Sequence, residues 1–161
     1  MRPPRRSARP WLAGIALACV LAVAAALFTQ HALGMQPCPW CVLQRLVFLF
    51  IALLAVPGAL SAAPLARVVS SALVVLGAAA GMAMALWQHF VSAASASCNL
   101  TFADRVMNAT GLGERFPAIF AAYANCADAK VDLLGVPYEF WSLALFALIG
   151  LVAASLLLRR R

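Results

Sequence analysis

The chain has 161 residues, of which 65% are hydrophobic and only 11% are charged. A soluble domain typically carries about 25% charged residues, so this composition excludes an ordinary soluble globular domain. It predicts an integral membrane protein that forms a single domain over residues 1–161. The formal net charge is +7, but the arginines flank apolar runs and no basic face is interleaved with aromatic residues, which argues against a nucleic-acid partner.

Four long apolar segments follow one another along the chain, and each is close to the length that a helix needs to cross about 30 Å of hydrocarbon. They span residues 11–28, 42–60, 68–90 and 140–158. A β-barrel would need short strands of alternating character. The sequence therefore predicts an all-α membrane protein, a four-transmembrane-helix bundle in contact with lipid. The second helix either bends at Pro57 or continues through it.

The placement of the arginines orients the bundle. Four crossings put both termini on one side, and eight arginines fall on that side: Arg2, Arg5, Arg6, Arg9, Arg67, Arg159, Arg160 and Arg161. All the acidic residues fall on the other side. Because basic residues are retained in the cytoplasm, we expect cytoplasmic termini and two extracytoplasmic loops, a short one over residues 29–41 and a long one over residues 91–139.

Four of the five cysteines fall in these two extracytoplasmic loops. Cys38 and Cys41 form a C-x-x-C pair in the short loop, and Cys98 and Cys126 lie in the long loop. Disulfides persist in that compartment, so an even number of cysteines there predicts two disulfides. The fifth cysteine, Cys19, lies in the middle of the first helix and is expected to be an inert packing residue.

The C-x-x-C pair favours redox chemistry over a structural role. A disulfide across two residues closes a tight ring, gains little chain entropy and is often reducible. A zinc site would need four ligands and only His31 is nearby, and haem attachment would need a histidine in place of Val42. The sequence therefore predicts a redox-active pair and no metal, with a simple loop staple as the alternative.

Two polar residues at the outer ends of apolar segments are candidates for holding an electron acceptor. Arg45 follows Cys41 by one helical turn on the same face, where its guanidinium would stabilise a thiolate and hold an acceptor oxygen. His89 ends the third segment on the same side of the membrane and could face Arg45 across the bundle. The alternatives are snorkelling to the interface for Arg45 and an ordinary interfacial position for His89.

The long loop is large enough to be a flexible arm. Cys98 and Cys126 would then form a mobile redox pair, or alternatively a structural staple, which would stabilise more here than in the short loop. Four apolar residues recur at helical spacing between the two cysteines: Phe116, Ile119, Phe120 and Tyr123. They predict either a short helix on the membrane surface or a small packed turn.

Together these residues resemble the disulfide bond formation protein B (DsbB) family, the quinone-dependent thiol oxidases of the bacterial inner membrane. The resemblance covers most of the chain. It rests on the four helices and on five local features: Pro37-Cys38-Pro39-Trp40-Cys41 followed by Arg45, Gln88-His89 at the end of the third helix, the pair Cys98 and Cys126, the run Asp132-Leu133-Leu134-Gly135-Val136-Pro137, and Trp141.

The resemblance implies the roles of the residues nearest the membrane. Cys38 and Cys41 would be the pair beside a quinone, either ubiquinone or menaquinone, with Cys41 facing the ring. Arg45 and His89 would flank the quinone.

The resemblance also implies how electrons enter. Cys98 would be attacked by a periplasmic DsbA-like thiol oxidase to form a mixed disulfide, and Cys126 would then exchange with Cys38. The redox loops would lie in the periplasm. The spacing around Pro137-Tyr138-Glu139 differs from the usual family pattern before Trp141, which leaves the start of the last helix open.

Two other functions remain as alternatives. A vitamin K epoxide reductase-like enzyme also couples thiols to a quinone in a helical bundle, but its quinone-side C-x-x-C belongs near the last helix, whereas Cys38 and Cys41 precede the second. A four-helix scaffold with structural disulfides would be non-enzymatic, and unlike an enzyme it would show no absorbance change when quinone is added.

Overall fold

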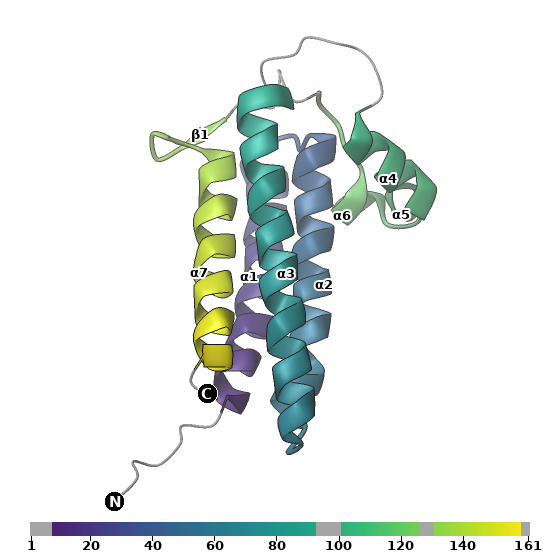
Figure 1. Ribbon diagram of the computed structural model, residues 1–161. Helices are drawn as coiled ribbons and strands as arrows, with labels where there is room; N and C mark the ends of the chain where they lie inside the picture. Colours follow the sequence, from purple (N-terminus) through teal and green to yellow (C-terminus); the bar gives the residue numbers. More distant parts are fainter. Residues whose placement is uncertain (1–7, 93–100, 126–130, 159–161) are drawn as a thin grey trace, which may run out of the picture.

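The computed structural model describes residues 8–92, 101–125 and 131–158. Within them, four long helices stand side by side in a bundle (Figure 1): α1 (Arg9–Ala32), α2 (Pro39–Leu60), α3 (Pro64–Trp87) and α7 (Tyr138–Leu158). A π-helical turn, η1 (Gln88–Ser92), continues α3. All four helices are long and apolar enough to cross a membrane, so the predicted all-α, four-helix membrane fold is confirmed.

The helices begin a few residues before the apolar segments do. Pro39 and Pro64 lie in the first turns of α2 and α3, where a missing backbone N–H removes no intrahelical hydrogen bond. An apolar segment is recognised by its hydropathy. A first helical turn that contains proline or polar residues therefore falls outside it. Pro57 lies inside α2, which continues through it to Leu60.

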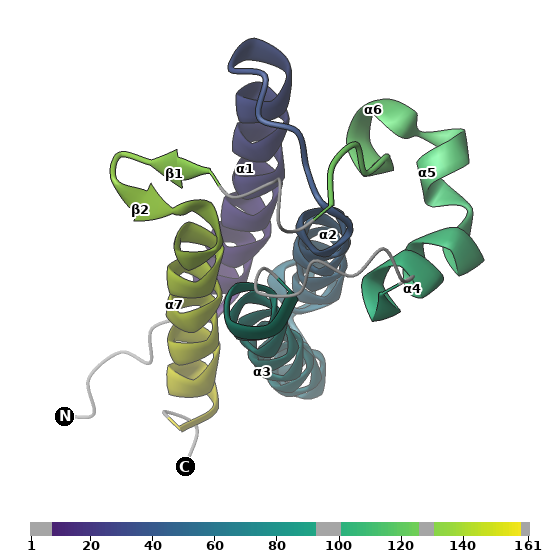
Figure 2. The same cartoon turned by 90° about the horizontal axis from the view of Figure 1, so that it is seen from above.

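The helices are arranged around the bundle in the order α1, α2, α3, α7 (Figure 2). Extensive contacts join each helix to the next in this order, whereas α1 and α7 touch only sparsely. The start of α1 and the end of α7 lie at the same end of the bundle (Figure 1). At that end Arg9 donates to the carbonyl of Ala59 and Arg67 to that of Ala62, and cations are favourable at the C-terminus of a helix.

The core of the bundle is centred on two stacked rings. Phe48 of α2 and Phe146 of α7 lie 4.0 Å apart and almost parallel. Gly81 of α3 faces Phe146, because a Cβ at this position would lie 2.5–2.6 Å from three ring atoms. Cys19 is fully buried in the same core, as expected for a packing residue.

This packing predicts that Gly81→Ala destabilises the bundle. The Phe146 ring is held by its stacking on Phe48 and has little room to yield to an added methyl group, so we expect a loss of about 1–3 kcal/mol in the free energy of unfolding. The measurement is the midpoint of thermal unfolding in detergent. Gly14→Ala is the matched control, since no atom lies within 4 Å of a Cβ there; equal midpoints for the two variants would contradict the prediction.

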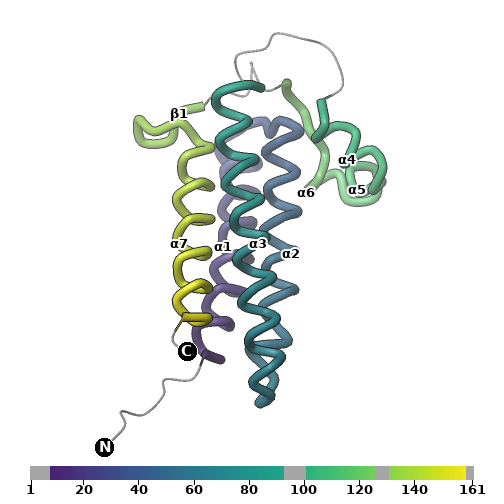
Figure 3. Tube along the Cα trace, in the orientation of Figure 1, coloured from purple at the N-terminus to yellow at the C-terminus, as the bar shows by residue number. Residues whose placement is uncertain are grey.

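Three short helices of the long loop pack beside the outer end of α2 (Figure 3): α4 (Phe102–Thr110), α5 (Leu112–Arg115) and α6 (Pro117–Phe120). We call them the arm helices. A capping box between Thr101 and Asp104 starts α4, and Gly111 ends it at φ 63°, a left-handed conformation that glycine tolerates.

The apolar pattern in the arm falls partly on the short helix α6, which contains Ile119 and Phe120. The helix α6 ends at Phe120, so Tyr123 lies beyond it. Phe120 is buried, whereas Phe116 and Tyr123 are exposed. The burial of Phe120 shows that this segment packs against the bundle, and its position at the membrane surface stays a prediction.

A two-stranded hairpin leads into the last helix. Its strands, β1 (Asp132–Leu133) and β2 (Val136–Pro137), pair antiparallel. Leu134 and Gly135 at the turn have φ values of 58° and 79°, the combination that a tight two-residue hairpin requires. Because the hairpin ends at Pro137, α7 starts at Tyr138 and brings Glu139 into its first turn.

Candidate redox site

The C-x-x-C pair forms the start of α2. Cys38 is the N-cap residue, and its Sγ accepts a hydrogen bond from the backbone N–H of Cys41 at 3.3 Å. The two sulfur atoms lie 2.9 Å apart, at hydrogen-bond distance. The helix start thus holds two thiols in contact, and its positive dipole end favours negative charge on them.

The two thiols face different surroundings. Cys38 is fully buried and belongs to an apolar cluster with residues of α2 and the arm helices: Trp40, Val42, Leu43, Ala103, Met107 and Phe120. Cys41 packs at the edge of the same cluster and in addition lines a cavity inside the bundle. Both thiols therefore contact the arm cluster, and Cys41 is the one that also borders the cavity.

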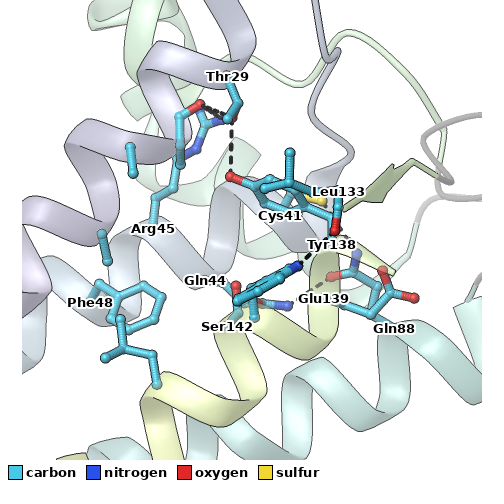
Figure 4. Close-up of a pocket in the computed structure, with 15 residues that line it drawn as sticks. Thr29, Cys41, Gln44, Arg45, Phe48, Gln88, Leu133, Tyr138, Glu139 and Ser142 are labelled. Carbon is cyan, nitrogen blue, oxygen red and sulfur yellow. Dashed lines mark hydrogen bonds between the residues drawn. The ribbon is translucent and has the colours of Figure 1, made fainter. Parts of the chain in front are cut away.

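The cavity has a volume of about 350 Å³ (Figure 4). Its α1 side is formed by small residues, Ala22, Ala25, Ala26 and Thr29, and its α7 side by Tyr138, Glu139, Trp141, Ser142 and Leu145. The remaining lining residues are Cys41, Gln44, Arg45, Phe48, Gln88 and Leu133. It is an apolar space with a polar outer end beside Cys41.

Arg45 lines this cavity and is only 5% exposed. Its Nη1 donates to Oε1 of Gln30 at 2.6 Å and to the carbonyl of Ile119 at 2.9 Å, and its Nη2 donates to the carbonyl of Ala26 at 3.4 Å. Within the described part of the chain no carboxylate lies within 4 Å of the guanidinium. The side chain points inward, and its charge is held by neutral oxygens alone.

A chain of two glutamines reaches the cavity-facing sulfur. Nε2 of Gln44 donates to Oε1 of Gln88 at 2.7 Å, and Nε2 of Gln88 donates to Sγ of Cys41 at 3.3 Å. The first bond fixes the orientation of the Gln88 amide, so that its N–H group faces the sulfur. Hydrogen-bond donation of this kind stabilises a thiolate.

The structure places His89 differently from what the sequence suggested. Its Nδ1 lies 2.6 Å from Oε1 of Glu139, and its ring packs against Phe90 and Phe140. His89 is absent from the cavity lining, whereas Glu139 is part of it. His89 thus faces α7 and reaches the cavity only through Glu139, and it does not face Arg45.

Sequence reasoning missed Glu139 and Gln30 as site residues. The sequence pattern assigns Glu139 to the loop because the apolar segment starts at Phe140. Had α7 been started two residues earlier, the rule that ionisable groups at membrane depth are functional would have selected it. Gln30 carries no such signal, since its role depends on the approach of Arg45 from another helix.

Cys98 and Cys126 lie outside the described residues. The segment before Cys126 is nevertheless tied to the short loop. The backbone N–H groups of Tyr123 and Ala124 both donate to the carbonyl of Pro37, at 3.0 Å and 3.3 Å. This tie brings the chain next to Cys38 two residues before Cys126 in the sequence.

Comparison with known proteins agrees with this geometry. Residues 8–156 match the family described as "Disulfide bond formation protein DsbB". A disulfide bond formation protein B of Herminiimonas arsenicoxydans is 31% identical over 97% of this chain and 99% of its own length. Another, of Verminephrobacter eiseniae, is 35% identical over 98% of this chain and 88% of its own length. The chain therefore belongs to the disulfide bond formation protein B family, membrane thiol oxidoreductases that generate disulfide bonds.

Proposed function

We propose that this protein oxidises a periplasmic DsbA-like dithiol oxidase and delivers the electrons to a membrane quinone bound in the cavity beside Cys41. The observation that carries the proposal is that Cys41 and the buried Arg45, whose charge no carboxylate within the described residues neutralises, line the same cavity. A guanidinium with neutral partners only is suited to hold an acceptor oxygen whose negative charge increases during reduction.

The cavity fits a quinone head group in size and chemistry. Its volume of about 350 Å³ falls within the range of about 300–1,000 Å³ typical of small-molecule sites. Its apolar walls suit a ring and a lipid tail, and Cys41 and Arg45 stand at the polar end. A bound quinone supplies a two-electron, two-proton acceptor. The lining does not distinguish ubiquinone from menaquinone.

Electrons would reach this pair through the long loop. The partner's dithiol reduces the Cys98–Cys126 disulfide and is itself oxidised, and the new dithiol of the loop then reduces the Cys38–Cys41 disulfide. Two electrons and two protons pass at each exchange. The burial of Cys38 beneath the arm helices, and the tie between Pro37 and the segment before Cys126, support Cys38 as the sulfur that exchanges with the arm.

The experiment that tests the proposal is an absorbance titration of the purified protein with quinone. A thiolate of Cys41 in contact with a bound quinone is expected to give a charge-transfer band, which Cys41→Ser removes. A protein that acts only as a scaffold with structural disulfides gives no band with any quinone. Absence of a band from the wild-type protein, together with absence of quinone reduction by added dithiol, would refute the proposed function.

The orientation of the bundle forms part of the proposal. Arginine placement predicts cytoplasmic termini and periplasmic redox loops. Reporter fusions after Arg67 and after Asn108 are therefore expected to report opposite sides of the membrane, the first cytoplasmic and the second periplasmic. If both fusions reported the same side, the proposed topology would be wrong.

A further inference from the structure

Glu139 is the single carboxyl group among the described residues that line the cavity. It lies in the first turn of α7 and is 9% exposed. Burial of a carboxylate is unfavourable unless the group is paired or protonated, and here it is paired with Nδ1 of His89 at 2.6 Å. An ionisable pair at this depth calls for an explanation that the thiols and Arg45 do not supply.

The proposed reaction requires proton transfer inside the cavity. When the dithiol is oxidised by a quinone, two S–H bonds break, one S–S bond forms and two O–H bonds form on the acceptor. Two electrons and two protons move from the dithiol to the acceptor, so the step exchanges no proton with the solvent overall. The sulfur atoms of Cys38 and Cys41 are 2.9 Å apart, whereas the two oxygens of a quinone lie at opposite ends of its ring. At least one proton must therefore be passed on by another group.

The other polar groups of the cavity are poorly suited to this task. The guanidinium of Arg45 stays protonated in proteins, and the amides of Gln44 and Gln88 donate hydrogen bonds without releasing protons. The hydroxyl of Tyr138 is hydrogen-bonded to Thr29 at 3.1 Å, and hydroxyl groups, including that of Ser142 in the same lining, give up a proton far less readily than a carboxylic acid does.

Glu139 also borders a second, smaller cavity next to the first. This space of about 30 Å³ is lined by Cys41, Arg45 and Glu139, among others, and extends to Gln36 and Val131 in the loops. It has room for a water molecule, which needs about 10–15 Å³. In Figure 4, Arg45 and Glu139 lie on either side of Cys41 and Tyr138. Glu139 thus borders both cavities, together with the thiol of Cys41.

We propose that Glu139 passes a proton to the acceptor bound in the cavity, and that His89 is the positioning residue that holds its carboxyl group for this transfer. The proton that Cys41 releases reaches the Glu139 carboxylate through the smaller cavity, and Glu139 then passes it to the acceptor. The proton count of the reaction closes in this way. The inference rests on the proposed function, because it needs a two-proton acceptor in the cavity.

The test compares three variants with the wild-type protein in quinone binding and in turnover. Glu139→Gln keeps the shape and a hydrogen bond but has no transferable proton, Glu139→Asp keeps the acid, and Asp132→Asn removes an exposed carboxylate outside the cavity as the matched control. Equilibrium binding of a short-chain ubiquinone gives the dissociation constant, and a small dithiol as reductant gives kcat and KM.

We expect Glu139→Gln to lower kcat about 100-fold, within the range of about 10²–10⁴ for general acid–base catalysis. Its dissociation constant and KM for ubiquinone should stay close to those of the wild-type protein. Glu139→Asp should recover a large part of kcat, and Asp132→Asn should match the wild-type protein throughout.

Two results would overturn the inference about Glu139 while leaving the proposed function intact. One is wild-type kcat in Glu139→Gln, especially if Tyr138→Phe is slow instead. The other is a loss of ubiquinone binding in Glu139→Gln that Glu139→Asp does not repair, which would mark the residue as structural. Failure of the wild-type protein to bind or reduce ubiquinone would instead refute the proposed function itself.

Discussion

A Cys41→Ser protein is expected to form a mixed disulfide with its thiol-oxidase partner through Cys98 and to reduce no quinone above the rate without protein. Cys41 is the thiol that lines the cavity, and a serine hydroxyl cannot replace a sulfur in disulfide formation. The trapped complex is measured on non-reducing gels, and quinone reduction is followed by absorbance with a small dithiol as reductant.

The companion variant Cys98→Ser should show the opposite pattern. It loses the mixed disulfide with the partner, yet it still passes electrons from a small dithiol to quinone, because Cys38 and Cys41 remain joined to the cavity. This separation is expected because Cys41, and not Cys38, lines the cavity, whereas Cys38 is fully buried in the cluster with the arm helices. If Cys98→Ser abolished reduction by a small dithiol as fully as Cys41→Ser does, in a folded protein, the two-stage relay would be wrong.

Replacement of Arg45 by lysine should raise the KM for quinone about 10- to 100-fold, since hydrogen bonds to charged groups contribute roughly 1.5–3 kcal/mol. Lysine keeps the charge but loses the planar fork that donates to Gln30, Ala26 and Ile119. Without these three bonds the charge has no fixed position in the cavity. Exchange with the protein partner should be affected much less, because it takes place at the arm.

Arg67→Lys is the matched control for this substitution. The Arg67 side chain donates to carbonyl groups of residues 62 and 63 at the far end of the bundle, so the same chemical change there should leave the KM for quinone unaltered. An unchanged KM in Arg45→Lys would reduce Arg45 to a structural residue that ties α1, α2 and α6 together.

The sequence was sufficient to predict the four helices and the placement of Cys41 and Arg45 on one helix face. Long apolar runs define helices in lipid because the backbone has no other way to satisfy its polar groups, and a spacing of four residues places two side chains on one helix face. Both residues do line one cavity.

What the sequence could not supply depends on contacts between helices. Glu139 becomes part of the site because α7 starts at Tyr138, directly after the hairpin. The helix therefore begins two residues before the apolar segment does. The contact between His89 and that carboxylate, at 2.6 Å, likewise joins two different helical segments. The different surroundings of Cys38 and Cys41 follow from the docking of the arm helices, which no local pattern encodes.

The sparse contact between α1 and α7 has a consequence for how an electron acceptor enters the cavity. The cavity is lined by residues of both helices, which touch each other only sparsely. Under the proposed function, a lipid-soluble acceptor and its reduced product are therefore expected to exchange by lateral diffusion, a search in two dimensions. Turnover is then set by the mole fraction of quinone in the bilayer: dilution of the membranes with buffer leaves it unchanged, whereas dilution of the quinone with added lipid slows it.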